Sequence, residues 1–260
     1  MALRICILAS GSSGNCTYVA SDQTAVLVDA GLSAREIGRR LEAIGAGVAG
    51  VRGVCVSHEH GDHTAGLRVL QERHGVPLYA NGGTIDALRR DPKLEGLRWQ
   101  VFTTGQMFQV GDLTIEPFSV PHDAYEPVGF VIGDGVARVG VVTDMGIPTT
   151  LVRERLRGCR VVVVESNHDE EMLLKAERPW YLKQRIMGRQ GHLSNQGAAA
   201  MLAEIATPQL DHVFLAHLSS ECNDPDLARK TAHDMLLKAG HTHVKVSVAF
   251  PDRVSEVWAG

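Results

Sequence analysis

The chain has 260 residues, of which 44% are hydrophobic, so one domain spanning residues 1–260 can bury a large core. The net charge of −4 excludes a globally basic protein, and any site for a nucleic acid must therefore be local. The five cysteines are scattered and form no C-x-x-C pair, which indicates reduced thiols. The apolar run at residues 5–9 is too short for a signal peptide, and no run reaches the roughly 18 apolar residues of a membrane-spanning helix. We therefore expect a cytoplasmic protein.

Short apolar segments alternate with amphipathic segments in both halves of the chain. Strands are predicted at residues 4–9, 17–20, 25–29, 53–56, 77–80, 113–120, 129–132, 138–143, 161–165, 212–216 and 244–248. Helices are predicted at residues 34–44, 62–74, 84–90, 149–157, 196–206 and 225–239. The stretch 158–191 is the least regular, and we expect an exposed helix or loop within it. The second half repeats the scheme of the first, which favours two sheets packed face to face with helices outside.

A cluster of histidines and carboxylates follows the apolar run at residues 53–56. His58 and His60 are two residues apart, so they point the same way if the chain is still extended there. Asp62 and His63 then stand at the start of the next predicted helix. A strand end that leads into a helix start can bring such ligands to one point, and imidazole with carboxylate suits Zn, Mn or Fe. The spacing His-x-His-x-Asp-His therefore predicts a metal site.

Four further predicted strands end in the same residue types. Asp29 is the last residue of its strand, and His122, Asp144 and His217 follow directly or closely after theirs. Each strand end alone is weak evidence. The alternative for Asp144 is an ordinary strand-end carboxylate or a helix N-cap, but its position in the series favours a metal ligand. Together with the His-x-His-x-Asp-His segment the four strand ends make five features in sequence order, and a coincidence is therefore improbable.

This pattern resembles the metallo-β-lactamase superfamily from end to end. The resemblance implies an α/β fold, a four-layer αββα sandwich with two facing mixed sheets and outer helices. It also implies two divalent metal ions, Zn or Mn, and a nucleophilic hydroxide bound to them. Carried over residue by residue, it implies a first ion on His58, His60 and His122, a second ion on Asp62, His63 and His217, and Asp144 as the bridge. Asp29 would orient a ligand imidazole rather than bind metal.

Glu165 and His192 add a prediction about the reaction. Glu165 ends the buried run Val161–Glu165, and His192 precedes the helix that begins near Gln196. The arrangement resembles the tRNase Z branch of the superfamily, which implies that the pair acts as general acid for the leaving oxygen. Asp62 is the third residue that we expect to take part in catalysis. The alternative for His192 is an ordinary residue at a helix start.

Two segments are candidates for substrate contacts. The Gly/Ser turn at residues 10–15 offers Ser13 and Asn15 to an anion, although it is equally compatible with a plain hairpin turn. The segment at residues 175–189 carries five basic residues and one acidic residue, with two aromatic residues among them. Basic and aromatic groups together suit phosphates and unstacked bases. The predicted contacts there are Lys183, Arg185, Arg189 and Trp180; the alternative is a solvated helix face with Trp180 packed inward.

Four blocks resemble one branch of the superfamily, the YycJ/WalJ-like proteins. These blocks are residues 8–15, 165–169, 191–195 and 216–223. The resemblance implies a metal-dependent nuclease, a 5′→3′ exonuclease with DNA as substrate. Alternatives are a small-molecule phosphodiesterase, a thioester or lactone hydrolase, and a flavodiiron-like redox or binding module. The Glu165–His192 pair argues against thioesters, because a thiolate leaving group needs little protonation. The sequence leaves open the metal, DNA versus RNA, the oligomeric state and the role of His168.

Overall fold

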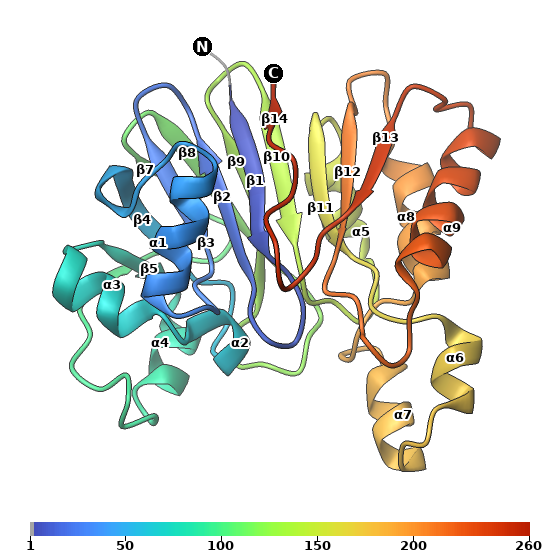
Figure 1. Ribbon diagram of the computed structural model, residues 1–260, viewed down its shortest axis with the longest axis horizontal. Helices are drawn as coiled ribbons and strands as arrows, with labels where there is room; N and C mark the ends of the chain where they lie inside the picture. The colour runs from blue at the N-terminus through green and yellow to red at the C-terminus, as the bar shows by residue number, and fades with distance from the viewer. Residues whose placement is uncertain (1–2) are drawn as a thin grey trace.

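The computed structural model describes residues 3–260 and contains two facing β-sheets with helices on both outer surfaces (Figure 1). The first sheet contains, in spatial order, β14 (Trp258–Ala259), β1 (Arg4–Ala9), β2 (Cys16–Ala20), β3 (Ala25–Val28), β4 (Val51–Cys55), β5 (Leu78–Ala80) and β6 (Trp99–Val101). The second contains β13 (Lys245–Val248), β12 (His212–Ala216), β11 (Val161–Glu165), β10 (Arg138–Val142), β9 (Val128–Gly133), β8 (Leu113–Ser119) and β7 (Phe108–Val110).

The helices form the outer layers. The first sheet is accompanied by α1 (Ala34–Ala43), α2 (Gly61–Thr64), α3 (Leu67–His74) and α4 (Gly82–Leu88), and a 3₁₀ turn, Val48–Gly50, precedes β4. The second sheet is covered by α5 (Thr150–Leu156), α8 (Asn195–Ile205) and α9 (Pro225–Lys238), while α6 (Glu170–Lys175) and α7 (Trp180–Ile186) project at the lower right in Figure 1. Among residues 3–260 no helix is long and apolar enough to cross a membrane. The predicted four-layer αββα architecture is confirmed.

Both sheets are mixed in the same way. In the first sheet β14, β1, β2 and β3 pair antiparallel, and β3 to β6 pair parallel. In the second sheet β7 to β10 pair antiparallel, and β10 to β13 pair parallel. The second half of the fold therefore repeats the strand arrangement of the first.

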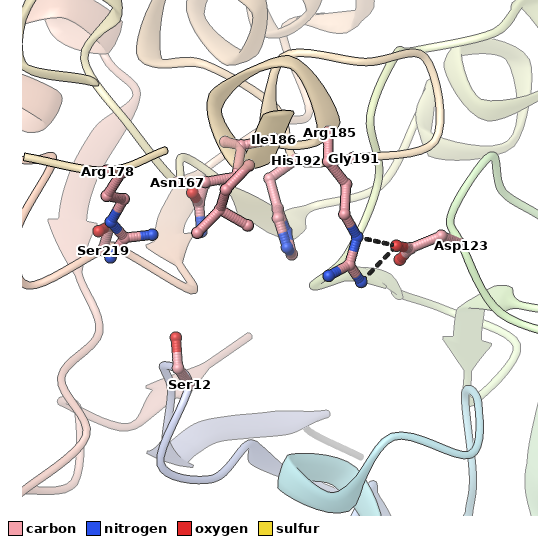
Figure 2. Close-up of a pocket in the computed structure, with 10 residues that line it drawn as sticks. Ser12, Asp123, Asn167, Arg178, Arg185, Ile186, Gly191, His192 and Ser219 are labelled. Carbon is pink, nitrogen blue, oxygen red and sulfur yellow. Dashed lines mark hydrogen bonds and ion pairs between the residues drawn. The ribbon is translucent and has the colours of Figure 1, made fainter. Parts of the chain in front are cut away.

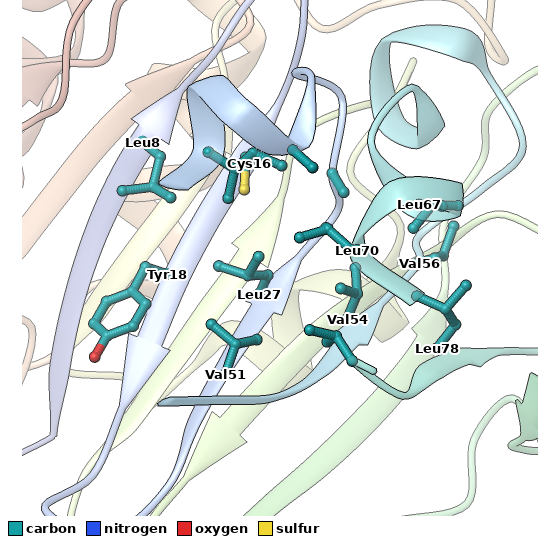
Figure 3. Packing of buried hydrophobic residues seen from close by; sticks show 14 of the residues in the cluster. Leu8, Cys16, Tyr18, Leu27, Val51, Val54, Val56, Leu67, Leu70 and Leu78 are labelled. Carbon is teal, nitrogen blue, oxygen red and sulfur yellow. The ribbon is translucent and has the colours of Figure 1, made fainter. Parts of the chain in front are cut away.

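Strand β3 shows how the sequence builds the layers. Its side chains alternate between faces, so Leu27 packs with the helices while Val26 and Val28 pack between the two sheets. Figure 3 shows Leu27 in the helix-facing cluster, where Leu67 and Leu70 of α3 cover the sheet. Strands buried on both faces carry almost only apolar residues, and each such side chain contributes about 1.5–3 kcal/mol when fully buried.

The structure differs from the predicted elements in several places. The helix predicted at 62–74 is two helices, because the Gly66 amide donates to the carbonyl of Ala30 instead of continuing α2. The irregular stretch 158–191 holds the two short helices α6 and α7 after β11. Strands β6, β7 and β14 were not predicted. Each has two or three residues, so it has no periodic pattern of its own and forms only by pairing with a longer neighbour.

The topology brings the predicted ligands to one edge of the sandwich. Strands β10, β11 and β12 run parallel, and β8 runs in the same direction because it is antiparallel to β9, which is antiparallel to β10. In the other sheet β3 and β4 run parallel. The carboxyl ends of these six strands lead to Asp144, Glu165, His217, His122, Asp29 and His58. At this edge Ser10 Oγ accepts a hydrogen bond of 2.8 Å from the amide of His217, which joins the two sheets.

Gly31 is the closest backbone approach at this edge. A Cβ atom there would lie 1.7 Å from the carbonyl oxygen of Asp62 and 2.5 Å from the amide of Asn15. We predict that Gly31→Ala lowers the free energy of unfolding by about 1–3 kcal/mol or more, because the backbone must move apart to admit the methyl group. Urea denaturation measures the loss. Gly82→Ala is the matched control, because a Cβ atom there meets nothing within 4 Å; equal stability of the two variants would contradict the prediction.

Candidate metal centre

His58, His60 and His122 form one half of a cluster at the edge described above. Nε2 of His58 lies 3.0 Å from Nδ1 of His60, and Nε2 of His122 lies 3.4 Å from the same atom. Ligand atoms bound at about 2.0–2.1 Å to a tetrahedral ion lie ~3.3 Å from one another. The three imidazole nitrogens are therefore spaced as ligands of a single divalent ion.

Asp62, His63 and His217 form the other half. Oδ2 of Asp62 lies 3.5 Å from Nε2 of His63 and 3.4 Å from Nε2 of His217. Asp144 stands between the halves, with Oδ2 3.1 Å from Nε2 of His63 and Oδ1 3.7 Å from Nε2 of His122. The structure thus brings all seven predicted ligand residues together, and two of the overlapping groups that they form are the predicted His58, His60 and His122 and the predicted Asp62, His63 and His217.

The chemistry of the cluster fits divalent cations. Asp144 Oδ2 and His217 Nε2 are buried and have no hydrogen-bond partner among residues 3–260, a costly state that a bound cation relieves. Burial by itself would raise the pKa of Asp144, but the imidazoles of His217 and His63 hold it well below its usual range. Burial by itself would lower the pKa of His217, but Asp144, Asp62 and Glu165 raise it to about 10. These pKa shifts show that the carboxylates favour positive charge in the site, and a set of carboxylate and imidazole groups suits Zn or Mn.

Asp29 contacts His63 on the side of the ring opposite Asp144. Its Oδ2 lies 2.8 Å from Nδ1 of His63, and its Oδ1 accepts a hydrogen bond of 2.7 Å from the amide of Ser57. The Nδ1 contact leaves Nε2 of His63 directed toward Asp144. Asp29 and His217 are the two non-glycine residues of the described chain with positive φ, at 63° and 54°. Such strain is often located at functional sites.

The position of Asn15 does not fit its predicted role as a substrate contact. It is buried, and its Nδ2 lies 3.2 Å from Oδ2 of Asp62 and 3.1 Å from Nε2 of His63. Its Oδ1 accepts a hydrogen bond of 2.9 Å from the amide of Gly11. The side chain therefore positions the ligand residues, because both ends of its amide group are engaged by the protein. Ser13 is exposed at the same turn.

Glu165 links the metal cluster to His192. Its Oε1 lies 2.6 Å from Nδ1 of His192 and 3.0 Å from Nδ1 of His217, and its Oε2 accepts hydrogen bonds from the amides of Met145 and Leu193. Burial alone would lower the pKa of His192, but the Glu165 carboxylate outweighs burial and raises it. The carboxylate therefore favours the protonated imidazole, which is the form that a general acid needs, and Nδ1 of His192 lies 3.8 Å from Oδ1 of Asp144.

A pocket of about 160 Å³ opens beside His192 (Figure 2). Arg185 of α7 crosses its rim and forms an ion pair with Asp123, from Nε to Oδ2 at 2.6 Å. The other oxygen of Asp123 lies 3.3 Å from Nε2 of His122. On the opposite wall are Arg178 and Ser219, and Ser12 of the β1–β2 turn lies across from α7.

The basic and aromatic residues of α7 and of the turn that follows it differ in exposure. Trp180 is 58% exposed and Tyr181 is 72% exposed, so Trp180 does not pack inward. Arg189 is also exposed. Lys183 is a correction to the prediction: it is 8% exposed, and its Nζ donates a hydrogen bond of 2.6 Å to the carbonyl of Leu174. Its charge stabilises the contact between α6 and α7 and is not presented to a polymer.

Several residues of the site were not predicted. Asp123 and Arg178 were not singled out, although Asp123 directly follows His122 and Arg178 belongs to the basic segment. Arg178 lies between α6 and α7 and meets Ser219 at the pocket only through the tertiary fold, so composition suggests the residue but not its position. His168, whose role the sequence left open, is buried; its Nδ1 has no hydrogen-bond partner among residues 3–260, and it lines a separate cleft behind His192.

Comparisons with known proteins agree with this geometry. A family model described as a β-lactamase superfamily domain matches residues 24–217. The chain is 36% identical over 247 residues to exodeoxyribonuclease YycJ of Bacillus anthracis, covering 92% of this chain and 91% of the relative. It is 35% identical over 237 residues to exodeoxyribonuclease WalJ of Streptococcus pneumoniae, covering 90% and 88%. Among solved structures, the metallo-β-lactamase fold protein YhfI from Bacillus subtilis aligns with a TM-score of 0.74 and 18% identity, covering 100% of this chain and 99% of that one.

The fold, the histidine and aspartate cluster and the matched family model define a metal-dependent hydrolase of the metallo-β-lactamase fold. The chain belongs to the β-lactamase superfamily, and it is similar over most of its length to the YycJ and WalJ exodeoxyribonucleases.

We predict that Asp29→Asn weakens metal binding roughly 10- to 100-fold, because the hydrogen-bonded carboxylate that orients His63 is replaced by a neutral group. Competition with a chromogenic chelator measures the dissociation constants for Zn²⁺ and Mn²⁺. Asp22→Asn, at an exposed turn between β2 and β3, makes the same chemical change away from the cluster. Wild-type affinity in Asp29→Asn would show that His63 needs no such partner.

Proposed function

We propose that the protein is a binuclear phosphodiesterase that degrades DNA as a 5′→3′ exonuclease. The observation that carries the proposal is the placing of the Glu165–His192 pair directly beside the seven-residue cluster, because a general acid there suits an oxygen leaving group. The two relatives named exodeoxyribonucleases match about 90% of the chain and support DNA as the substrate. A cytoplasmic location remains our prediction, and the five buried, unpaired cysteines are compatible with a reducing compartment.

The metal ions would be Zn or Mn. One would be held by His58, His60 and His122, the other by Asp62, His63 and His217, with Asp144 between them. Bound divalent ions supply a water of lowered pKa and stabilise negative charge on phosphoryl oxygens.

The proton that leaves with the product comes from His192. Its Nδ1 is engaged by Glu165, so Nε2 is the nitrogen available to donate a proton to the oxygen of the departing strand. Glu165 cannot itself deliver this proton, because it is fully buried and accepts hydrogen bonds from two backbone amides. The carboxylate therefore keeps the imidazole charged and oriented, and the imidazole acts on the substrate.

The exposed surface of α7 would hold the polymer beside the metal cluster. Trp180 and Tyr181 offer aromatic faces for unstacked bases, and Arg189, in the turn that follows α7, offers a positive charge to a phosphate. This surface is local, as the net charge of −4 requires. A polymer-binding surface of this kind distinguishes a nuclease from a small-molecule phosphodiesterase, because a small substrate does not reach it.

We predict that His192→Ala keeps its metal content but cleaves DNA ~10²–10⁴-fold more slowly, because the leaving oxygen must depart without a proton. Element analysis measures the metal, and steady-state kinetics measure turnover. The loss should be much smaller on bis-p-nitrophenyl phosphate, whose nitrophenolate leaves readily without protonation. An equal loss on both substrates would assign His192 a structural or binding role.

A second prediction concerns the surface of α7. Trp180→Ala should weaken DNA binding by about 1–3 kcal/mol if one base stacks on the indole. Arg189→Ala should reduce the slope of log K against log salt by about 0.7–0.9 if it contacts one phosphate. Binding titrations at several salt concentrations measure both effects.

Arg52→Ala is the matched control for Arg189, because Arg52 is exposed on β4 far along the strand from the ligand His58. Cleavage of bis-p-nitrophenyl phosphate should fall much less than cleavage of DNA in the α7 variants. Unchanged DNA affinity and salt slope would show that α7 is only a solvated face, and the small-molecule phosphodiesterase would then become the better proposal.

A further inference from the structure

The pocket beside His192 is rich in groups that can bind an anion. Its walls include Arg178, Arg185, His192 and the hydroxyl groups of Ser12 and Ser219, with Asp123 as the only carboxylate in its lining. Ser219 Oγ accepts hydrogen bonds from the amides of residues 221 and 222, at 3.4 and 3.1 Å, which leaves its proton available to donate. Figure 2 shows these side chains on opposite walls around an open centre, with His192 between the two arginines.

Arg178 and Arg185 each form an ion pair through one edge of the guanidinium group. Arg178 donates from Nε and Nη2 to Oε2 of Glu221, at 2.9 and 2.6 Å. Arg185 is held in the same way by Oδ2 of Asp123, at 2.6 and 2.5 Å. Among residues 3–260, Nη1 of Arg178 and Nη1 of Arg185 make no hydrogen bond or ion pair. The second edge of each guanidinium group is therefore free to bind a ligand. The carboxylates thus fix the two planes in advance, and a planar guanidinium with a free edge suits the oxygens of a phosphate.

The size of the pocket restricts what it accepts. A cavity of about 150 Å³ holds one benzene molecule in an engineered protein, so 160 Å³ suits a single group of that size and not a nucleoside. This volume is sufficient for the phosphate group at the end of a strand. A terminal phosphate monoester carries a charge of about −1.5 to −2 near neutral pH, which two arginine edges neutralise better than they match the single charge of an internal diester.

We infer that this pocket is a subsite for the terminal phosphate monoester of the DNA strand, next to the bond that is cut. The inference rests on the function proposed above and gives it a physical basis. Cleavage begins at a phosphorylated end, because that end is bound between Arg178 and Arg185. Arg178 binds the terminal phosphate, and Glu221 positions Arg178.

The test uses the metal-loaded full chain and duplexes of one sequence that differ only at their ends. One carries a 5′-phosphate, one a 3′-phosphate, and one has hydroxyl groups at both ends. We expect kcat/KM to be at least about tenfold higher for the 5′-phosphorylated duplex, as for a charge-assisted bidentate contact. In Arg178→Gln this preference should fall toward one. Glu221→Gln should reduce it partly, because Arg178 keeps its charge but loses its fixed orientation.

Lys175→Gln is the matched control, because it removes one positive charge from neighbouring α6, where Lys175 pairs with Glu171 and does not line the pocket. It should keep the wild-type preference. Thermal melting of Arg178→Gln checks that this exposed ion pair is not needed for folding.

Each other outcome has a definite meaning. DNA degraded at the same rate from both kinds of 5′ end, or an equal loss on both in Arg178→Gln, overturns the subsite and leaves the nuclease function standing. A preference for 3′-phosphorylated ends that Arg178→Gln removes keeps the subsite and overturns the 5′→3′ direction. Hydrolysis of bis-p-nitrophenyl phosphate without cleavage of any duplex overturns the proposed function and this subsite with it.

Discussion

Three carboxylates, those of Asp29, Asp144 and Glu165, are at most 5% exposed, and each of them contacts at least one imidazole. Buried carboxylates are costly unless positive charge and hydrogen bonds compensate them. The fold meets this requirement by ending six strands at one edge and joining the sheets there, so that histidines from both halves of the chain converge. The left-handed backbone of Asp29 and His217 and the close backbone approach at Gly31 follow from the same crowding. Charge compensation at this edge is thus the constraint to which the surrounding backbone conforms.

The sequence was informative wherever one residue type had to follow a strand end. His58, His60, Asp62 and His63 come from one continuous segment, so their convergence needs only a strand, a turn and a helix start. The distant ligands could be named only from a family resemblance, because no local pattern in the chain specifies that separate strand ends meet. The layer architecture was predictable for a similar reason, since long apolar strands and amphipathic helices show their burial in their own residues.

The parts that could not be predicted depend on tertiary contacts between short segments. Lys183 looks like any surface lysine in the sequence, yet α6 lies against α7 and the carbonyl of Leu174 takes its ammonium group. Asn15 stands in a turn typical of anion contacts, yet it is covered by the Asp62 segment and holds two ligand residues. The pairing of Arg178 with Glu221 and of Arg185 with Asp123 joins residues separated by about forty and sixty positions, and no periodicity encodes such pairs.

The α6–α7 pair is attached to the sandwich by a small core of its own, in which Leu173, Ile186 and Cys222 are the buried side chains. The sheets and their covering helices share far larger clusters. Local stability follows buried apolar area, so this segment should open in a sub-global step while the sandwich stays folded, and its amide hydrogens should exchange with solvent sooner than those of β11 or β12. We therefore expect the wall that carries Trp180, Arg178 and Arg185 to open without disturbing the edge where the predicted metal ligands converge.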